Sequence, residues 1–111
     1  MNKIFSERNR KRCESPNGFN HQLNDWSSSD WMVAILGELG EAANVLKKLN
    51  RVRDGIKGNK ETHLELEQKL ALELADAYIY LDLFCQSRNI DLKSVVELSF
   101  NTKSKEIGYI E

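Results

Sequence analysis

Two pairs of acidic residues have a spacing that places both side chains of each pair on one face of a helix. The first pair is Glu38 and Glu41, and the second is Glu73 and Asp76. Residues three apart in an α-helix point in nearly the same direction, so the two carboxylates of each pair project together. Four carboxylates around one cavity offer the hard oxygen ligands that Mg²⁺ or Mn²⁺ prefers. The sequence therefore predicts a divalent-metal site held by these four acids.

The helical neighbours of these acids are apolar. On a helical wheel Glu38 lies about 20° from Trp31, and Glu73 shares its face with Leu66 and Phe84. No lysine or arginine lies in the apolar stretch that contains the second pair. An ionised carboxylate in such surroundings costs several kcal/mol unless a counter-charge compensates it. We therefore expect the acids to be largely buried and to need a cation from outside the helix.

Other metal chemistries fit the sequence poorly. A carboxylate-bridged di-iron bundle requires a Glu-x-x-His step on two helices, and the chain has no such step. Cys13 and Cys85 lie far apart, without the clustering that binds zinc. His21 and His63 are interpreted as ordinary polar residues rather than metal ligands.

The first acidic pair lies on a predicted helix from about Asp30 to Val52. Residues 27–30 can accept hydrogen bonds from the free N–H groups of its first turn. Its apolar residues recur at three- and four-residue steps and form one stripe: Trp31, Ile35, Leu39, Ala42, Leu46 and Leu49. The polar segment at 53–60 contains two glycines and predicts a loop.

The second pair lies on a predicted helix over about 62–87, which begins with a capping box of Thr62 and Glu65. The latter half of this helix is apolar around most of its circumference, so it must be buried on more than one side. In a chain of 111 residues this predicts a homo-oligomer with the helix at its centre. A break at Asn89 precedes a third helix, capped by Asp91, that ends near residue 105.

The predicted fold class is all-α. Residues 1 to about 28 contain the only proline and lack sustained periodicity, so we expect an irregular N-terminal arm. About three main helices and this arm form one domain over 1–111, completed by homo-oligomerisation into a four-helix-bundle core.

Composition and charge exclude several classes of protein. Hydrophobic residues at 41% and charged residues at 30% argue against disorder, and a net charge of −1 makes nucleic acid an unexpected partner. No apolar run is long enough for a membrane span or a secretory signal. Two isolated cysteines fit a reducing, cytoplasmic location.

The acidic motifs also carry a family resemblance. Glu38-Leu-Gly-Glu41, and Glu73-Leu-Ala-Asp76 followed by Ala-Tyr-Ile-Tyr-Leu, resemble the signature of the all-α nucleoside triphosphate pyrophosphohydrolases. The stretches GFNHQLNDW, SDWMVAILGELGEAANVLKKLNRVRDGIKGN and SFNTKSKEIGY resemble small, single-domain MazG-like proteins of phages and mobile elements. The resemblance covers about residues 8–109. It implies hydrolysis of a nucleoside triphosphate to a monophosphate and pyrophosphate, often to remove unwanted nucleotides, and a dimer or a dimer of dimers.

This resemblance assigns roles to particular residues. The four acids would hold Mg²⁺, with Mn²⁺ able to replace it, and the cation would neutralise phosphate charge and activate a water. Alternatively, one of the glutamates serves as a general base. The predicted phosphate-binding residues are Asn44, Lys48, Arg51, Asn101 and Lys103, although relatives often carry a lysine where this chain has Ser99. The predicted base-binding residues are His21, Trp26, Trp31 and Tyr80.

Two other classes of function stay open. Arg8, Arg10, Lys11 and Arg12 form a basic arm, which a small nucleic-acid-binding or regulatory protein would explain, although that function leaves the acids unexplained. In a catalytically silent helical oligomer, the acids would instead pair with Arg51 or Arg53 of a neighbouring chain.

Overall fold

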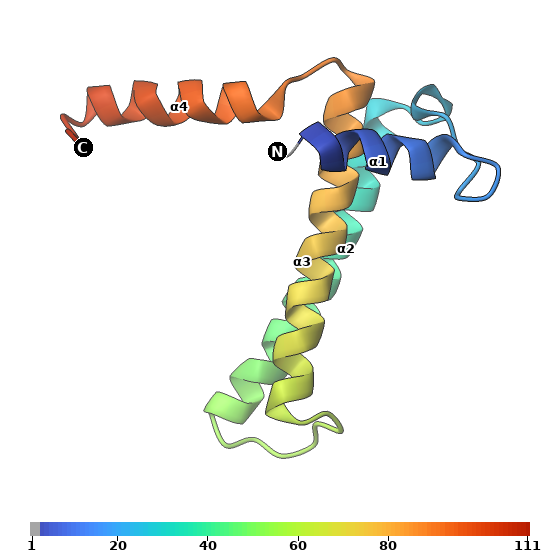
Figure 1. Cartoon of the computed structure of the whole chain (residues 1–111). Coiled ribbons are helices and arrows are strands. Elements are labelled where there is room, and N and C mark those ends of the chain that lie inside the picture. The colour runs from blue at the N-terminus through green and yellow to red at the C-terminus, as the bar shows by residue number, and fades with distance from the viewer. Residues whose placement is uncertain (1–2) are drawn as a thin grey trace. The chain divides into compact units, whose positions relative to one another are not determined.

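A computed structural model describes residues 3–111 (Figure 1). All regular secondary structure in the described residues is helical, which confirms the predicted all-α class. In order they are α1 (Lys3–Glu14), the short 3-10 helix η1 (Leu23–Asp25), α2 (Ser28–Arg53), α3 (His63–Ser87) and α4 (Leu92–Glu106). The chain divides into two compact units: residues 26–81 form one, and the segments before residue 26 and after residue 81 form the other.

The unit of residues 26–81 is a helical hairpin. The Ser27 hydroxyl accepts a hydrogen bond from the Asp30 N–H (3.1 Å), and the Asp30 carboxylate accepts one from the Ser27 N–H (2.9 Å). Thr62 and Glu65 form the same reciprocal pair before α3, at 3.1 and 3.2 Å. These bonds satisfy N–H groups that the first helical turn leaves free. Both predicted helices, the loop between them and the predicted capping box are confirmed.

The apolar stripe of α2 is buried only in part. Trp31 and Ala42 are buried, whereas Leu39 and Leu46 are 42% and 44% exposed. On α3, Leu66 is completely buried. The two helices lie side by side (Figure 1), and one chain leaves part of their apolar surface in contact with solvent.

The second unit joins α1 to the last turns of α3 through a buried carboxylate. Asp82, which is 2% exposed, accepts hydrogen bonds from Ser6 Oγ (2.7 Å), Asn9 Nδ2 (2.9 Å) and Gln86 Nε2 (3.0 Å). The expectation of an irregular N-terminal arm and three main helices is therefore wrong, because residues 3–14 form a fourth helix. An apolar stripe does not mark this helix, since it is anchored through polar side chains.

Replacing Asp82 with alanine is expected to destabilise the fold by about 2 kcal/mol or more, because three hydrogen bonds to a buried carboxylate are lost together. Urea unfolding followed by circular dichroism measures the change. Glu7→Ala, an exposed position on α1, is the control and should stay within about 0.5 kcal/mol of the wild type. Equal midpoints for Asp82→Ala and the control would contradict the anchoring role.

The end of α3 and the start of α4 follow the predicted signals. Asn89 has a φ of 56°, a left-handed conformation that ends a helix. The Asp91 carboxylate caps α4 by accepting hydrogen bonds from the N–H and the hydroxyl of Ser94, at 3.5 and 2.9 Å. Four apolar residues of α4 are exposed: Val95, Val96, Leu98 and Phe100. None of the described helices has the length and apolarity that crossing a membrane requires.

Candidate metal centre

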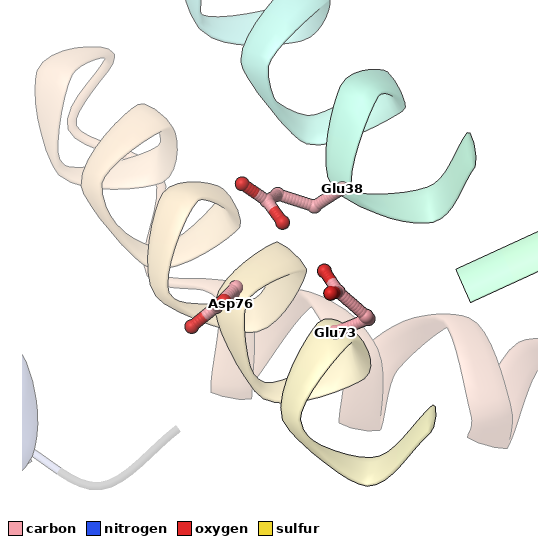
Figure 2. A group of neighbouring side chains, drawn as sticks. All are labelled: Glu38, Glu73 and Asp76. Carbon is pink, nitrogen blue, oxygen red and sulfur yellow. The ribbon is translucent and has the colours of Figure 1, made fainter. Parts of the chain in front are cut away.

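Three of the four predicted acids converge between the two helices of the hairpin. One carboxylate oxygen from each of Glu38, Glu73 and Asp76 lies within 4.8 Å of the others. Figure 2 shows Glu38 extending from α2 toward α3, where Glu73 is turned back toward it and Asp76 lies one turn further along. The three-residue spacing on α3 and the hairpin together bring these acids to one place. The group offers oxygen ligands only, which is the donor chemistry of Mg²⁺ and Mn²⁺.

Glu41, the fourth predicted acid, lies beside Glu73. The pKa of Glu41 is raised above its ordinary value, first because its side chain shares a hydrogen bond with Glu73 and second because the negative charge of Glu73 opposes its ionisation. Such coupling arises when two carboxylates compete for one proton at short range. All four acids therefore belong to one cluster.

The raised pKa of Glu41 makes the free energy of unfolding depend on pH. A folded-state pKa above the unfolded value of 4.5 means that the contribution of Glu41 is favourable below pH 4.5 and is lost as pH rises through the raised pKa. In metal-free buffer, Glu41→Gln should therefore gain stability relative to the wild type as pH rises from 4.5 to neutrality. Urea unfolding in EDTA at several pH values tests this, and a constant difference between the two proteins would contradict it.

The acids are less buried than the helical wheel predicts. Glu38 and Glu73 are half-buried, whereas Glu41 and Asp76 are exposed, so the expectation of burial is wrong for the latter two. The reason is that apolar neighbours such as Leu39 and Leu72 are themselves exposed on the single chain. The sequence pattern identifies an apolar surface without showing what covers it.

Glu73 gives the clearest indication that the cluster suits a cation. Its Oε2 atom is buried and has no hydrogen-bond partner. A buried carboxylate oxygen beside other carboxylates is costly, and a divalent ion would satisfy it. The site therefore fits a metal by its donor set, by the convergence of its acids and by this unsatisfied oxygen.

Positive charge adjoins the acids in a hollow of about 280 Å³. Lys48 Nζ donates a hydrogen bond to Glu61 Oε2 at 2.7 Å, and this bond is the main reason why the pKa of Glu61 is lowered. The hollow is lined by Glu41, Asn44, Val45, Lys48, Glu61, Lys69 and Glu73. The structure thus brings the predicted Asn44 and Lys48 to the acids.

Two charged residues of this hollow are absent from the sequence-based prediction. Lys69 precedes Glu73 by four residues, a spacing that places both on one helix face and that sequence reasoning missed. Glu61 follows the loop between the helices, and nothing in its local sequence marks it as a partner of Lys48.

Three aromatic rings lie together in the hairpin. The ring centroids of Trp26 and Trp31 are 4.7 Å apart, and those of Trp26 and Tyr80 are 6.3 Å apart in a stacked arrangement. Trp31 is buried and supports the other two rings, which are half-buried. Tyr80 lies one helical turn after Asp76, so the rings adjoin the acids on α3.

The remaining predicted contacts fall elsewhere in the chain. Arg51 is exposed near the end of α2. His21, Asn101 and Lys103 belong to the other unit, and Lys103 pairs with Glu106 at 3.1 Å. Their assignment to phosphate or base binding stays a prediction.

The hairpin and its acids define an all-α protein with a carboxylate cluster suited to a divalent cation. Comparison of the chain with protein-family models, curated proteins and solved structures gives no match. The resemblance to MazG-like proteins therefore rests on the sequence motifs alone.

Proposed function

We propose that this protein is a Mg²⁺-dependent nucleoside triphosphate pyrophosphohydrolase that releases a nucleoside monophosphate and pyrophosphate, as the motif resemblance implies. The observation that supports this most is the convergence of Glu38, Glu73 and Asp76 from two helices within 4.8 Å, with one buried oxygen of Glu73 unsatisfied. An acidic cluster alone specifies no reaction. Here lysines on one side and aromatic rings on the other supply the chemistry that binds phosphates and a base.

Different side chains of the hairpin have different roles in the proposed reaction. Glu38, Glu73 and Asp76 would hold the cation, which when bound supplies Lewis acidity to the phosphates. Glu41 lies beside these three acids and has a raised pKa, which suits a general base that accepts a proton from the attacking water. As the water oxygen bonds to the α-phosphorus, the bond from this phosphorus to the oxygen bridging the α- and β-phosphates breaks. Lys48 would stabilise the charge of the departing pyrophosphate.

The direct test is product analysis with a panel of ribo- and deoxyribonucleoside triphosphates, with Mg²⁺ and with EDTA. The proposal requires monophosphate and pyrophosphate in equal amounts, formed only with the divalent cation. Orthophosphate and a nucleoside diphosphate would place cleavage between the β- and γ-phosphates and would overturn the proposal. No turnover of any nucleotide would also overturn it.

The exposed apolar surface supports a homo-oligomer as part of this proposal. Leu36 on α2, Leu72 and Leu74 on α3, and Phe100 on α4 are each about half exposed or more. A dimer or a tetramer would cover such surfaces, and apolar patches of this kind are characteristic of interfaces. Light scattering coupled to size-exclusion chromatography measures the mass, and a monomer at micromolar concentration would exclude this arrangement.

Nucleic-acid binding is the second candidate. Arg8, Lys11 and Arg12 line one hollow of about 520 Å³ on α1, so the basic residues form a local patch. Binding of a fluorescent DNA duplex, with a strong dependence on salt and loss in an Arg8→Ala, Lys11→Ala double variant, would favour this function. It would leave the carboxylate cluster unexplained.

A further inference from the structure

Two lysines share one carboxylate at the edge of the hollow. Glu61 Oε2 lies 2.7 Å from Lys48 Nζ and 3.7 Å from Lys69 Nζ. Lys48 belongs to α2, Lys69 to α3, and Glu61 to the segment that joins the two helices. Because two ammonium groups face one carboxylate, one positive charge of this trio is not matched within it.

The trio is held in place by the loop that carries Glu61. The Glu61 side chain is only 13% exposed, and Asn59 Nδ2, two residues earlier, donates a hydrogen bond to the Lys48 carbonyl at 2.8 Å. The loop is thereby tied to α2 beside the hollow. The lysines keep more of their surface in solvent, at 41% and 55%, so an anion can reach them.

Basic, acidic and aromatic side chains follow one another in the same order along the two helices of the hairpin. On α3 a single face carries, in order, Lys69, Glu73, Asp76 and Tyr80. The helix α2 runs in the opposite direction. Followed from its C-terminal end, it carries the same order of side chains: Lys48, Glu41, Glu38 and Trp31. From residue 69 to residue 80 the helix rises about 16 Å, which is comparable with an extended nucleoside triphosphate. Ammonium groups, carboxylates and aromatic rings thus follow one another along both helices.

The size of the hollow is consistent with binding of a phosphate tail alone. Pockets that enclose a whole drug-sized ligand measure about 300–1,000 Å³, whereas this hollow measures about 280 Å³. A nucleotide with its phosphates here would extend its base away from the lysines and toward the aromatic rings. The phosphate furthest from the base would then lie beside Lys48, Glu61 and Lys69.

We propose that Lys48, Glu61 and Lys69 form a clamp for the terminal phosphate, through which the site selects triphosphates over diphosphates. Lys69 binds the γ-phosphate and determines this specificity, while Glu61 is a positioning residue that holds both ammonium groups at the required place. The two ammonium groups supply the attraction, since charge-assisted hydrogen bonds to phosphate are among the strongest in proteins. The identity of the substrate as a nucleotide rests on the proposed function, but the preference for three linked phosphates is testable without it.

The first experiment compares kinetic constants for a nucleoside triphosphate and its diphosphate in the wild type, Lys69→Gln and Glu61→Gln. Lys69→Gln should reduce kcat/KM for the triphosphate roughly ten- to a hundredfold and leave the diphosphate value nearly unchanged. Glu61→Gln should raise KM for the triphosphate with little change in kcat, because the lysines remain but are no longer held. Lys57→Gln, an exposed lysine of the same loop, is the matched control and should keep the wild-type preference.

The second experiment uses inorganic tripolyphosphate and pyrophosphate as ligands in isothermal titration calorimetry with Mg²⁺. The wild type and Lys57→Gln should bind tripolyphosphate more tightly, and Lys69→Gln should lose that preference while its circular dichroism spectrum stays unchanged. If no nucleotide is hydrolysed but this pattern appears, the proposed function fails and the clamp stands. Equal affinity for the two ligands in the wild type, or an undiminished preference in Lys69→Gln, overturns the clamp.

Discussion

Glu73→Gln is expected to reduce turnover of the nucleoside triphosphate by about a thousandfold or more, which corresponds to about 4 kcal/mol of transition-state stabilisation. Glu73 lies close to Glu38 and Asp76, is the main cause of the raised pKa of Glu41, and carries the buried oxygen without a partner. The amide has nearly the same shape as the carboxylate but lacks its charge and offers one oxygen instead of two. A cation would therefore lose one of the carboxylates that would hold it.

Pyrophosphate release at saturating Mg²⁺ measures this effect, with circular dichroism to show that the helices persist. Glu67→Gln is the matched control, because Glu67 lies on the same helix and is half exposed beside His63, outside the cluster. Its turnover should equal that of the wild type. Unchanged turnover in Glu73→Gln would remove this residue from the site and with it the proposed metal centre.

Magnesium is expected to raise the melting temperature of the metal-free protein by about 10 °C when its concentration is about a hundred times the dissociation constant. A ligand that binds only the folded state contributes about 2.7 kcal/mol at that concentration, and each kcal/mol shifts the melting temperature of a domain of this size by about 4 °C or more. The physical source is the relief of repulsion among the carboxylates, which is the second cause, after the hydrogen bond with Glu73, of the raised pKa of Glu41.

Thermal unfolding of EDTA-treated protein across a MgCl₂ series tests this expectation, with NaCl at equal ionic strength as the control. Glu73→Gln should show a much smaller shift. If Mg²⁺ stabilises the wild type no more than NaCl does, the acids do not form a metal site, and a silent helical oligomer becomes the better explanation of the fold.

Local signals in the sequence were sufficient to predict most of the helical structure. The capping box at Thr62 and Glu65, the break at Asn89 and the cap at Asp91 all act within a few residues, and each occurs as expected. The prediction missed α1, because this helix has no apolar stripe and its stabilising partner, Asp82, lies more than seventy residues away. Local patterns do not report such contacts.

The candidate site was predictable to a similar degree. Spacing predicted the two pairs of acids, and antiparallel packing of α2 and α3 brought them together. The clamp was not predictable, because the bonds of Glu61 to the two lysines depend on the path of a loop. The burial of the acids was overestimated, since the apolar residues around them are not covered within one chain.

The two reciprocal caps fix the start of each acid-bearing helix independently of the loop that joins the helices. Each acid-bearing helix starts from its own cap, so the repeat of the helix sets the positions of the ligands along it, whereas the joining loop determines where Glu61 lies. Lengthening a surface loop costs little, with each doubling adding only about 0.6 kcal/mol. In the proposed enzyme, insertions in this loop would therefore alter the recognition of the phosphate tail and leave the acids of the metal site in place.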